Sequence, residues 1–237
     1  MRVYDWLDSR DDHVAKVVCI VQARTTSERF PMKIMAGLHG RPMLAHVLER
    51  AAAIQGVDQV VLAVPQRDVS IVSHLWPHVY GGSEKDVLSR YAGAAELYEA
   101  DVIVRVTGDC PLLAVDIASV AVDMFGTDKR GYLPVCQPYE PVTDGWDIEI
   151  FGIYLLREAM ATASKEMREH VTTWMRIGVD IEFPSFAVPP GDYTALKCSV
   201  DTLEDLKRVW KIMDCLEDKT DFSHTATWRA WEKSGRP

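Results

Sequence analysis

Three positively charged side chains closely follow one short apolar run near the start of the chain. Residues 17–21 are β-branched except at Cys19, which indicates a buried strand. Arg24, Arg29 and Lys33 come directly after this run. In α/β proteins, ligands bind at the carboxyl ends of the strands. The placement therefore favours a polyanion site, with a nucleoside triphosphate as the first candidate, and the alternative is a solvated basic loop.

The stretch lacks both common glycine-rich phosphate motifs. It contains neither Gly-x-x-x-x-Gly-Lys-Ser/Thr nor Gly-x-Gly-x-x-Gly, so neither the P-loop nor the dinucleotide fingerprint applies. Any bound phosphate would have to be neutralised by side chains rather than mainly by a glycine-rich backbone.

Two aspartates are expected at the same edge of the sheet. Asp109 follows a predicted strand at 101–106, and Asp201 follows a predicted short strand at 198–200. Mg²⁺ takes one or two carboxylates together with phosphate oxygens. Cations, carboxylates and a metal together suit phosphoryl or nucleotidyl transfer, which needs positioning and charge neutralisation. Taken singly, Asp109 is also an ordinary turn residue and Asp201 an ordinary helix-start acid.

Composition bounds the class of protein. A chain of 237 residues builds one large α/β domain or two small ones, and the net charge of −9 argues against a nucleic-acid binder. The segment 1–15 does not resemble a signal peptide, and no apolar stretch is long enough to span a membrane. The five cysteines are scattered without a Cys-x-x-Cys pair, so we expect reduced thiols, a cytoplasmic location and no zinc site.

Predicted strands and helices alternate over the first half of the chain, which implies a mostly parallel sheet with right-handed crossovers. The predicted strands are 17–21, 59–64, 79–80 and 101–106, and the predicted helices are 42–54, 68–76, 84–100 with Ser83 as its cap, and 115–124.

The second half is less regular. We expect extended, irregular chain at 132–142, a strand at 146–151, helices at 152–163 and 165–177, a loop at 183–196, and a helix at 203–216. Thr202 and Asp205 form a weak capping box for that last helix. Trp228 and Trp231 in the charged segment 218–237 are expected to pack onto the body.

Six blocks of the sequence, in order, resemble one enzyme family. Residues 22–33, Gln-Ala-Arg-Thr-Thr-Ser-Glu-Arg-Phe-Pro-Met-Lys, are similar to the Arg-x-x-Ser-x-Arg-Leu-Pro-x-Lys signature of CTP-dependent cytidylyltransferases. The closer match is the branch described as spore coat polysaccharide biosynthesis proteins, related to the CMP-Kdo and CMP-sialate synthetases. The remaining blocks are 82–91, 104–112, 144–151, 168–172 and 199–206. Met32 stands where the family usually has Gly, and Phe30 where it has Leu.

The resemblance implies a three-layer, Rossmann-like α/β nucleotidyltransferase (GT-A-like) fold with a mostly parallel sheet. It implies a single domain over 1–237, an inserted arm near 132–151 that serves homodimer formation, and a C-terminal extension at 218–237. It also implies CTP as co-substrate, Mg²⁺ as cofactor, and release of pyrophosphate as CMP is joined to an acceptor.

The resemblance also carries over individual residues. Arg24, Arg29 and Lys33 would be catalytic and hold the triphosphate, with Lys33 neutralising charge on the α-phosphate. Asp109 and Asp201 would hold Mg²⁺. The nucleotide-binding set comprises Val21, Gln22, Ala23, Arg24, Ser27, Arg29, Lys33, Gly82, Ser83 and Asp109.

The acceptor is less well defined. Anion-binding candidates are Arg105, Arg168 and His170, and candidates for an amine or hydroxyls are Asp144, Asp147 and Glu149. An exposed strand face and a solvated helix face are the alternatives for these residues. Because no residue stands out as a dedicated base, an acidic acceptor is favoured, such as a sugar acid, a phosphate or a phosphonate.

Two other function classes compete with a cytidylyltransferase. A glycosyltransferase would need an Asp-x-Asp metal motif, which Asp147-Ile148-Glu149 imitates poorly. A non-catalytic nucleotide-binding protein would not need Lys33, Asp109 and Asp201 together. The expected partners are CTP, a small acidic acceptor and a second copy of the chain, with no nucleic acid and no membrane.

Overall fold

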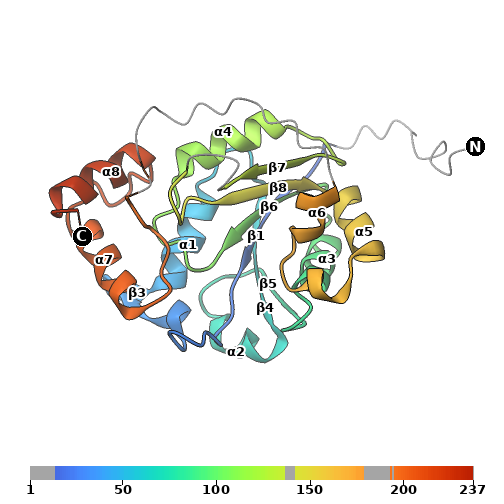
Figure 1. Cartoon of the computed structure of the whole chain (residues 1–237), viewed down its shortest axis with the longest axis horizontal. Coiled ribbons are helices and arrows are strands. Elements are labelled where there is room, and N and C mark those ends of the chain that lie inside the picture. The colour runs from blue at the N-terminus through green and yellow to red at the C-terminus, as the bar shows by residue number, and fades with distance from the viewer. Residues whose placement is uncertain (1–13, 137–141, 179–192, 194, 237) are drawn as a thin grey trace, which may run out of the picture.

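The computed structural model contains a central sheet with helices packed on both faces (Figure 1). It describes residues 14–136, 142–178, 193 and 195–236. This arrangement confirms the predicted three-layer α/β architecture. Among the described residues, none of the helices combines the length and apolar character that a membrane crossing requires.

The central sheet has six strands in the order β5-β4-β1-β6-β8-β7. Four of them are parallel, which confirms a mostly parallel sheet: β1 (Val17–Gln22), β4 (Gln59–Pro65), β5 (Val79–Gly82) and β6 (Val102–Thr107). The remaining two, β8 (Ile148–Gly152) and β7 (Tyr132–Val135), continue the sheet in antiparallel fashion. The order places β1 in the interior of the sheet, between β4 and β6.

The side chains of β1 explain why it lies at the centre. Val17, Cys19 and Val21 pack into the core on one face of the sheet, and Val18 and Ile20 pack into the core on the other. A strand buried on both faces needs an uninterrupted apolar sequence, and β1 has one. The loop that follows it therefore starts from a fixed point.

Each face of the sheet has its own helices. One core includes side chains from α1 (Met43–Ala52), α4 (Val115–Phe125), α7 (Leu203–Asp214) and α8 (His224–Lys233). The other includes side chains from α3 (Val87–Leu97), α5 (Ile153–Thr162) and α6 (Thr173–Gly178). Short elements complete the fold: η1 (Lys33–Met35), β2 (Gly37–Leu38), β3 (Arg41–Pro42), η2 (Gln66–Asp68), α2 (Val69–Val72) and η3 (Lys165–Arg168).

The predicted start of the helix at residue 84, with Ser83 as its cap, was wrong. Asp86, not Ser83, is the cap of α3, and its carboxylate accepts the backbone N–H of Ser89 at 2.9 Å. Ser83 instead accepts the N–H of Asp86 at 3.0 Å through its hydroxyl. The Ser83 hydroxyl thus closes a turn over residues 83–86, and Asp86 then caps the helix that follows.

Several other boundaries differ from the prediction. Residues 198–200 form no strand, and beside them only a single bridge joins Lys197 to Asp144. Residues 132–135 are a regular strand of the sheet, whereas the helix predicted at 165–177 is divided into η3 and α6, and that at 68–76 is reduced to η2 and α2. Most of the predicted loop at 183–196 lies outside the described residues.

The C-terminal expectations are confirmed. Thr202 and Asp205 form a complete capping box at the start of α7. Trp231 of α8 is buried in the core, and Trp228 packs against Tyr193 with ring centroids 4.9 Å apart. The segment after residue 217 therefore covers one end of the body.

Candidate active site

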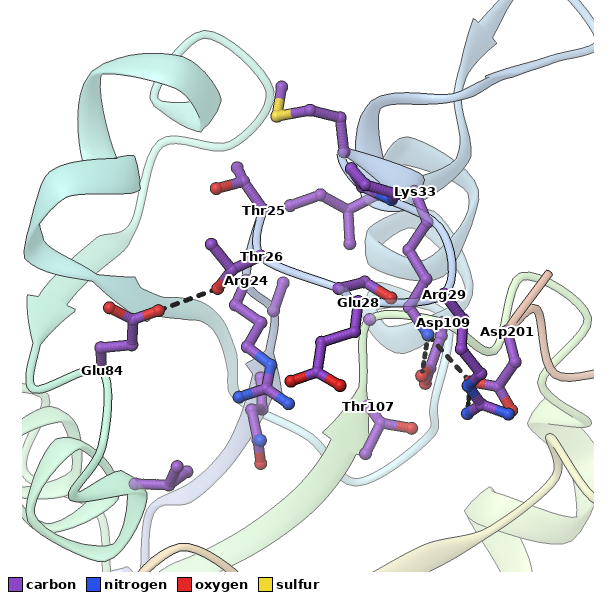
Figure 2. Close-up of a pocket in the computed structure, with 18 of the residues that line it drawn as sticks. Arg24, Thr25, Thr26, Glu28, Arg29, Lys33, Glu84, Thr107, Asp109 and Asp201 are labelled. Carbon is purple, nitrogen blue, oxygen red and sulfur yellow. Dashed lines mark hydrogen bonds and ion pairs between the residues drawn. The ribbon is translucent and has the colours of Figure 1, made fainter. Parts of the chain in front are cut away.

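A pocket of about 940 Å³ opens at the carboxyl ends of β1 and β6. Figure 2 shows how the labelled side chains surround it, with Arg24, Thr26 and Glu84 on one side and Lys33, Asp109 and Asp201 on the other. Most of the lining comes from the loop after β1 and from the turn after β6. This is the edge at which open α/β sheets bind ligands.

Lys33 lies between the two aspartates. Its ammonium group donates to Asp109 Oδ2 at 2.8 Å, to the carbonyl oxygen of Val200 at 2.9 Å and to Asp201 Oδ1 at 3.1 Å. Burial alone would lower the pKa of Lys33, but the charges and hydrogen bonds of Asp109 and Asp201 outweigh it and hold this pKa above its ordinary value. Side chains from three distant parts of the sequence thus meet at one point.

Asp201 attracts further cations. Arg29 Nη2 lies 3.0 Å from Asp201 Oδ1, and Lys197 Nζ lies 3.5 Å from Asp201 Oδ2. Burial opposes ionisation of Asp201, but the hydrogen bond and charge of Lys33 and the charge of Arg29 outweigh it and lower the pKa. Asp201 is therefore a carboxylate at neutral pH, although it does not stand at a strand end as predicted. The backbone N–H of Val200 donates to the carbonyl of Asp109 at 2.9 Å, and this bond brings the two aspartates together.

The cationic loop is held at its base by an acid that the sequence analysis missed. Asp68, 1% exposed, accepts the backbone N–H of Thr25 at 2.9 Å and the Thr25 hydroxyl at 2.8 Å. Thr25 in turn accepts the N–H of Met32 at 2.9 Å through its carbonyl, which closes the loop. Asp68 lies just beyond the carboxyl end of β4, so the argument used for Asp109 would also have identified it.

Backbone conformation explains two further residues of this edge. Met32 adopts φ 59° and ψ 20°, the left-handed region in which Gly carries no penalty. At Gly108 an added Cβ would lie 2.8 Å from Cβ of Ala23 and 3.1 Å from the carbonyl oxygen of Gln22, so only Gly lets the two loops approach so closely.

Arg24 extends into the pocket from the same loop (Figure 2). It is exposed, and no described residue forms an ion pair with it. Beside it the Thr26 hydroxyl donates to Glu84 at 2.9 Å, and Arg67 forms an ion pair with Glu84. Arg24 is thus a cation that faces the pocket and is available to an anionic ligand.

The structure brings most of the predicted nucleotide and metal residues to this pocket. The lining includes Gln22, Ala23, Arg24, Ser27, Arg29, Lys33, Asp109, His170 and Asp201. Val21 is fully buried in β1 directly beneath it, and Gly82 and Ser83 lie next to the lining residue Glu84. The lining does not include Arg105, Asp147, Glu149 or Arg168, which were predicted to bind the acceptor.

Glu149 and Arg105 belong to a buried network instead. Glu149, 1% exposed, accepts from Arg105 at 2.6 Å, from Thr172 at 3.0 Å and from Arg176 at 2.7 Å, and it also bonds to Tyr132. Burial opposes its ionisation, but Arg105, Tyr132 and Arg176 outweigh it and lower its pKa. The alternative considered for Glu149, an exposed strand face, is therefore wrong. Arg105 and Glu149 are register partners in adjacent strands.

Two further acceptor candidates, Arg168 and Asp147, also have internal partners. Arg168 donates to Asp86 at 2.8 Å and to the carbonyl of Met160 at 3.1 Å, which fastens η3 to the start of α3. Asp147 accepts the N–H of Gly145 at 3.0 Å, and burial raises the pKa of Asp147. Of the predicted acceptor residues, His170 alone both lines the pocket and is exposed.

A doubly wound sheet with cations and paired carboxylates at this edge defines a nucleotidyltransferase. The family model described as cytidylyltransferase matches residues 18–138. The chain therefore belongs to the cytidylyltransferase family, and it is an enzyme that uses CTP.

Individual relatives agree with this assignment. The chain is 32% identical over 201 residues to the uncharacterized protein MJ1063 of Methanocaldococcus jannaschii, covering 81% of each chain. It is 34% identical over 110 residues to the 3-deoxy-manno-octulosonate cytidylyltransferase of Pelobacter propionicus, covering 45% of this chain and 43% of that relative. A cytidylyltransferase structure from Leptospira borgpetersenii superposes with a TM-score of 0.82 at 27% identity, covering 93% of this chain and 95% of that one.

Proposed function

We propose that the protein transfers CMP from CTP to a small acidic acceptor, a sugar acid, a phosphate or a phosphonate, with release of pyrophosphate. The observation that carries the proposal is the meeting of Lys33, Asp109 and Asp201 within 3.1 Å at the sheet edge. Attack by an acceptor oxygen on the α-phosphorus forms one P–O bond and breaks the bond to the β-phosphate oxygen. Positive charge is what this step needs most, because negative charge accumulates on the phosphoryl oxygens.

Each residue of the pocket has a role in this proposal. Arg24 and Arg29 bind the triphosphate, and Lys33 neutralises charge at the α-phosphate. Gln22, Ala23 and Ser27, with the neighbouring Val21, Gly82 and Ser83, bind the nucleoside. We assign Arg105, Asp147, Glu149 and Arg168 to the framework, because each has internal partners.

Mg²⁺ is the cofactor we propose. Asp109 and Asp201 suit a cation, because their oxygens already converge on the ammonium group of Lys33. Among the described residues, no cluster of three or more His, Cys, Asp or Glu side chains offers a complete metal site. The two carboxylates would therefore hold Mg²⁺ together with phosphate oxygens, the mode this ion commonly uses. When bound, it would supply further neutralisation of phosphate charge.

In this proposal His170 binds the acceptor. His170 lines the pocket from the loop between η3 and α6. An imidazole there can donate a hydrogen bond to a carboxylate or phosphate. No general base is required, because an acidic acceptor already carries a nucleophilic oxygen anion.

Two features of cellular context belong to the same proposal. A cytoplasmic location is supported by the five cysteines, all of them free thiols. A homodimer through the segment 132–151 rests on the family resemblance. Size-exclusion chromatography with light scattering tests it, and a monomer at micromolar concentration would contradict it.

The test of the reaction is pyrophosphate release from CTP against a panel of sugar acids, phosphates and phosphonates. We expect release with one acceptor class, preference for CTP over UTP, ATP and GTP, and no turnover by Lys33→Ala that retains the wild-type circular dichroism spectrum. A fully active Lys33→Ala enzyme, or release with neutral sugars alone, would contradict the proposal.

A further inference from the structure

Every N–H of the Lys33 ammonium group is engaged by the protein. A lysine ammonium has three donors, and Lys33 uses them on Asp109, Asp201 and the carbonyl of Val200. The Lys33 side chain is only 11% exposed. In this arrangement Lys33 has no donor left for a phosphate, although its proposed role is to bind one. To reach a nucleotide, Lys33 must give up at least one of these bonds.

The space that Lys33 fills is also the space that a metal would need. Asp109 Oδ2 and Asp201 Oδ1 both converge on Nζ, so a divalent cation bound by the same two oxygens would stand beside a positive charge. Two positive charges held by the same pair of carboxylate oxygens lie close together and repel strongly in a partly buried site. We call this space, bounded by Asp109, Asp201 and the Val200 carbonyl, the cation seat.

Resting on the proposed function, we propose that Lys33 closes the cation seat to divalent cations until nucleotide phosphates draw its ammonium group away. Binding of nucleotide and metal is then positively coupled through one side chain. The coupling is reciprocal, so metal also strengthens nucleotide binding. The cation seat therefore binds the metal only together with the triphosphate.

The neighbouring cations provide a matched control. Lys197 lies 3.5 Å from Asp201 Oδ2 and 3.4 Å from Asp205, and Arg29 lies 3.0 Å from Asp201 Oδ1. Lys197 contributes the same formal charge as Lys33 to Asp201, but it contacts Asp201 from outside the cation seat and does not bridge to Asp109. If net charge alone controlled metal binding, Lys197→Met would act like Lys33→Met. If metal binding is controlled by the Lys33 ammonium group occupying the cation seat, only Lys33→Met will make the seat available to the metal.

The experiment measures binding of Mn²⁺ to the full-length protein by the electron paramagnetic resonance signal of the free ion. The proteins are wild type, Lys33→Met, Lys33→Gln, Lys197→Met and the double variant Lys33→Met with Asp109→Asn. Each is titrated with Mn²⁺ alone, and wild type is also titrated in the presence of CTP. The shift of melting temperature caused by Mn²⁺ provides a second measurement on the same proteins.

We expect Lys33→Met and Lys33→Gln to bind one Mn²⁺ without nucleotide at least about tenfold more tightly than wild type, within the usual range of such coupling. Lys197→Met should gain less than about threefold, and the double variant should lose the gain. Mn²⁺ should raise the melting temperature of Lys33→Met more than that of wild type.

Two results would overturn the inference, and a third would concern the proposed function instead. The proposal that Lys33 closes the cation seat is refuted if Lys33→Met and Lys33→Gln bind Mn²⁺ no better than wild type. It is also refuted if Lys197→Met gains as much Mn²⁺ affinity as Lys33→Met. If wild type with CTP binds no Mn²⁺ at all, the assignment of the metal to Asp109 and Asp201 is contradicted, and this assignment belongs to the proposed function.

Discussion

Replacement of Asp68 by Ala should impair CTP binding although Asp68 does not line the pocket. Asp68 holds the N–H and the hydroxyl of Thr25, which is only 8% exposed, so water cannot freely replace it. A hydrogen bond to a charged group contributes about 1.5–3 kcal/mol, so the two bonds together are worth about 3 kcal/mol or more. This free energy orders the loop that carries Arg24, Arg29 and Lys33.

The loss should appear mainly in the KM for CTP. If CTP binding must reorder the loop, about 3 kcal/mol corresponds to about a hundredfold in affinity, and partial compensation leaves an increase of at least about tenfold. Because the loop is held alike in the ground and transition states, saturating CTP should restore most of kcat. Steady-state pyrophosphate release at varied CTP concentration measures both constants.

Two variants make this experiment decisive. Asp68→Asn can still accept from the Thr25 N–H and donate to the Thr25 hydroxyl, so its KM should rise only a few-fold. Glu149→Gln, a change at another buried acid, should lower stability and leave the KM for CTP within about twofold. An Asp68→Ala enzyme with an unchanged KM would refute the reasoning, as would an equal increase in Glu149→Gln.

The remaining predictions concern stability and ligand contacts. Glu149→Gln leaves Arg105 and Arg176 without a countercharge and should lower the free energy of unfolding by about 3 kcal/mol. In a calorimetric scan this corresponds to a melting temperature lower by about 6–12 °C. A decrease of less than about 1 °C would contradict the claim that this buried network stabilises the fold. Because the folded-state pKa of Glu149 is depressed, its contribution to stability is fully present above the unfolded pKa and is lost as pH falls through the folded-state pKa. The stabilities of wild type and Glu149→Gln should therefore converge in acid, once the pH lies below the folded-state pKa. Met32→Gly relieves a left-handed backbone and should raise the melting temperature by about 1–4 °C without loss of activity, whereas a decrease would show that the Met side chain outweighs the strain. His170→Ala should raise the KM for the acceptor at least about tenfold and leave the KM for CTP nearly unchanged, and the reverse pattern would move His170 to the nucleotide.

The sequence alone was sufficient for the part of the site that depends on sheet order. A buried strand followed by Arg24, Arg29 and Lys33 indicated one edge, and the alternation of strands and helices brought Asp109 to the same edge. Asp201 was expected there for a wrong reason, because residues 198–200 form no strand. The bond from Val200 N–H to the Asp109 carbonyl positions Asp201, and no local pattern predicts a bond across 91 residues.

Register explains what the sequence could not indicate about the acceptor residues. Glu149 looked like one of two acids on an open strand face. Arg105 stands opposite it in β6 and Arg176 approaches from α6, so the carboxylate is buried and paired. A strand pattern fixes which face a residue occupies but not which helix covers that face. Asp68 follows the carboxyl end of β4, as Asp109 follows β6, but the sequence analysis placed it in a predicted helix, and its contact with Thr25, 43 residues away, was not foreseen.

The central claim is that Arg24, Arg29 and Lys33 bind a triphosphate whose metal is held by Asp109 and Asp201. The most direct test is a crystal structure with Mn²⁺ and a non-hydrolysable α,β-methylene analogue of CTP, with the metal located by anomalous scattering. We predict one strong peak between Asp109 and Asp201, the phosphates in contact with all three cations, and Lys33 Nζ on the α-phosphate. A metal peak away from both aspartates, or phosphates outside this pocket, would contradict the account.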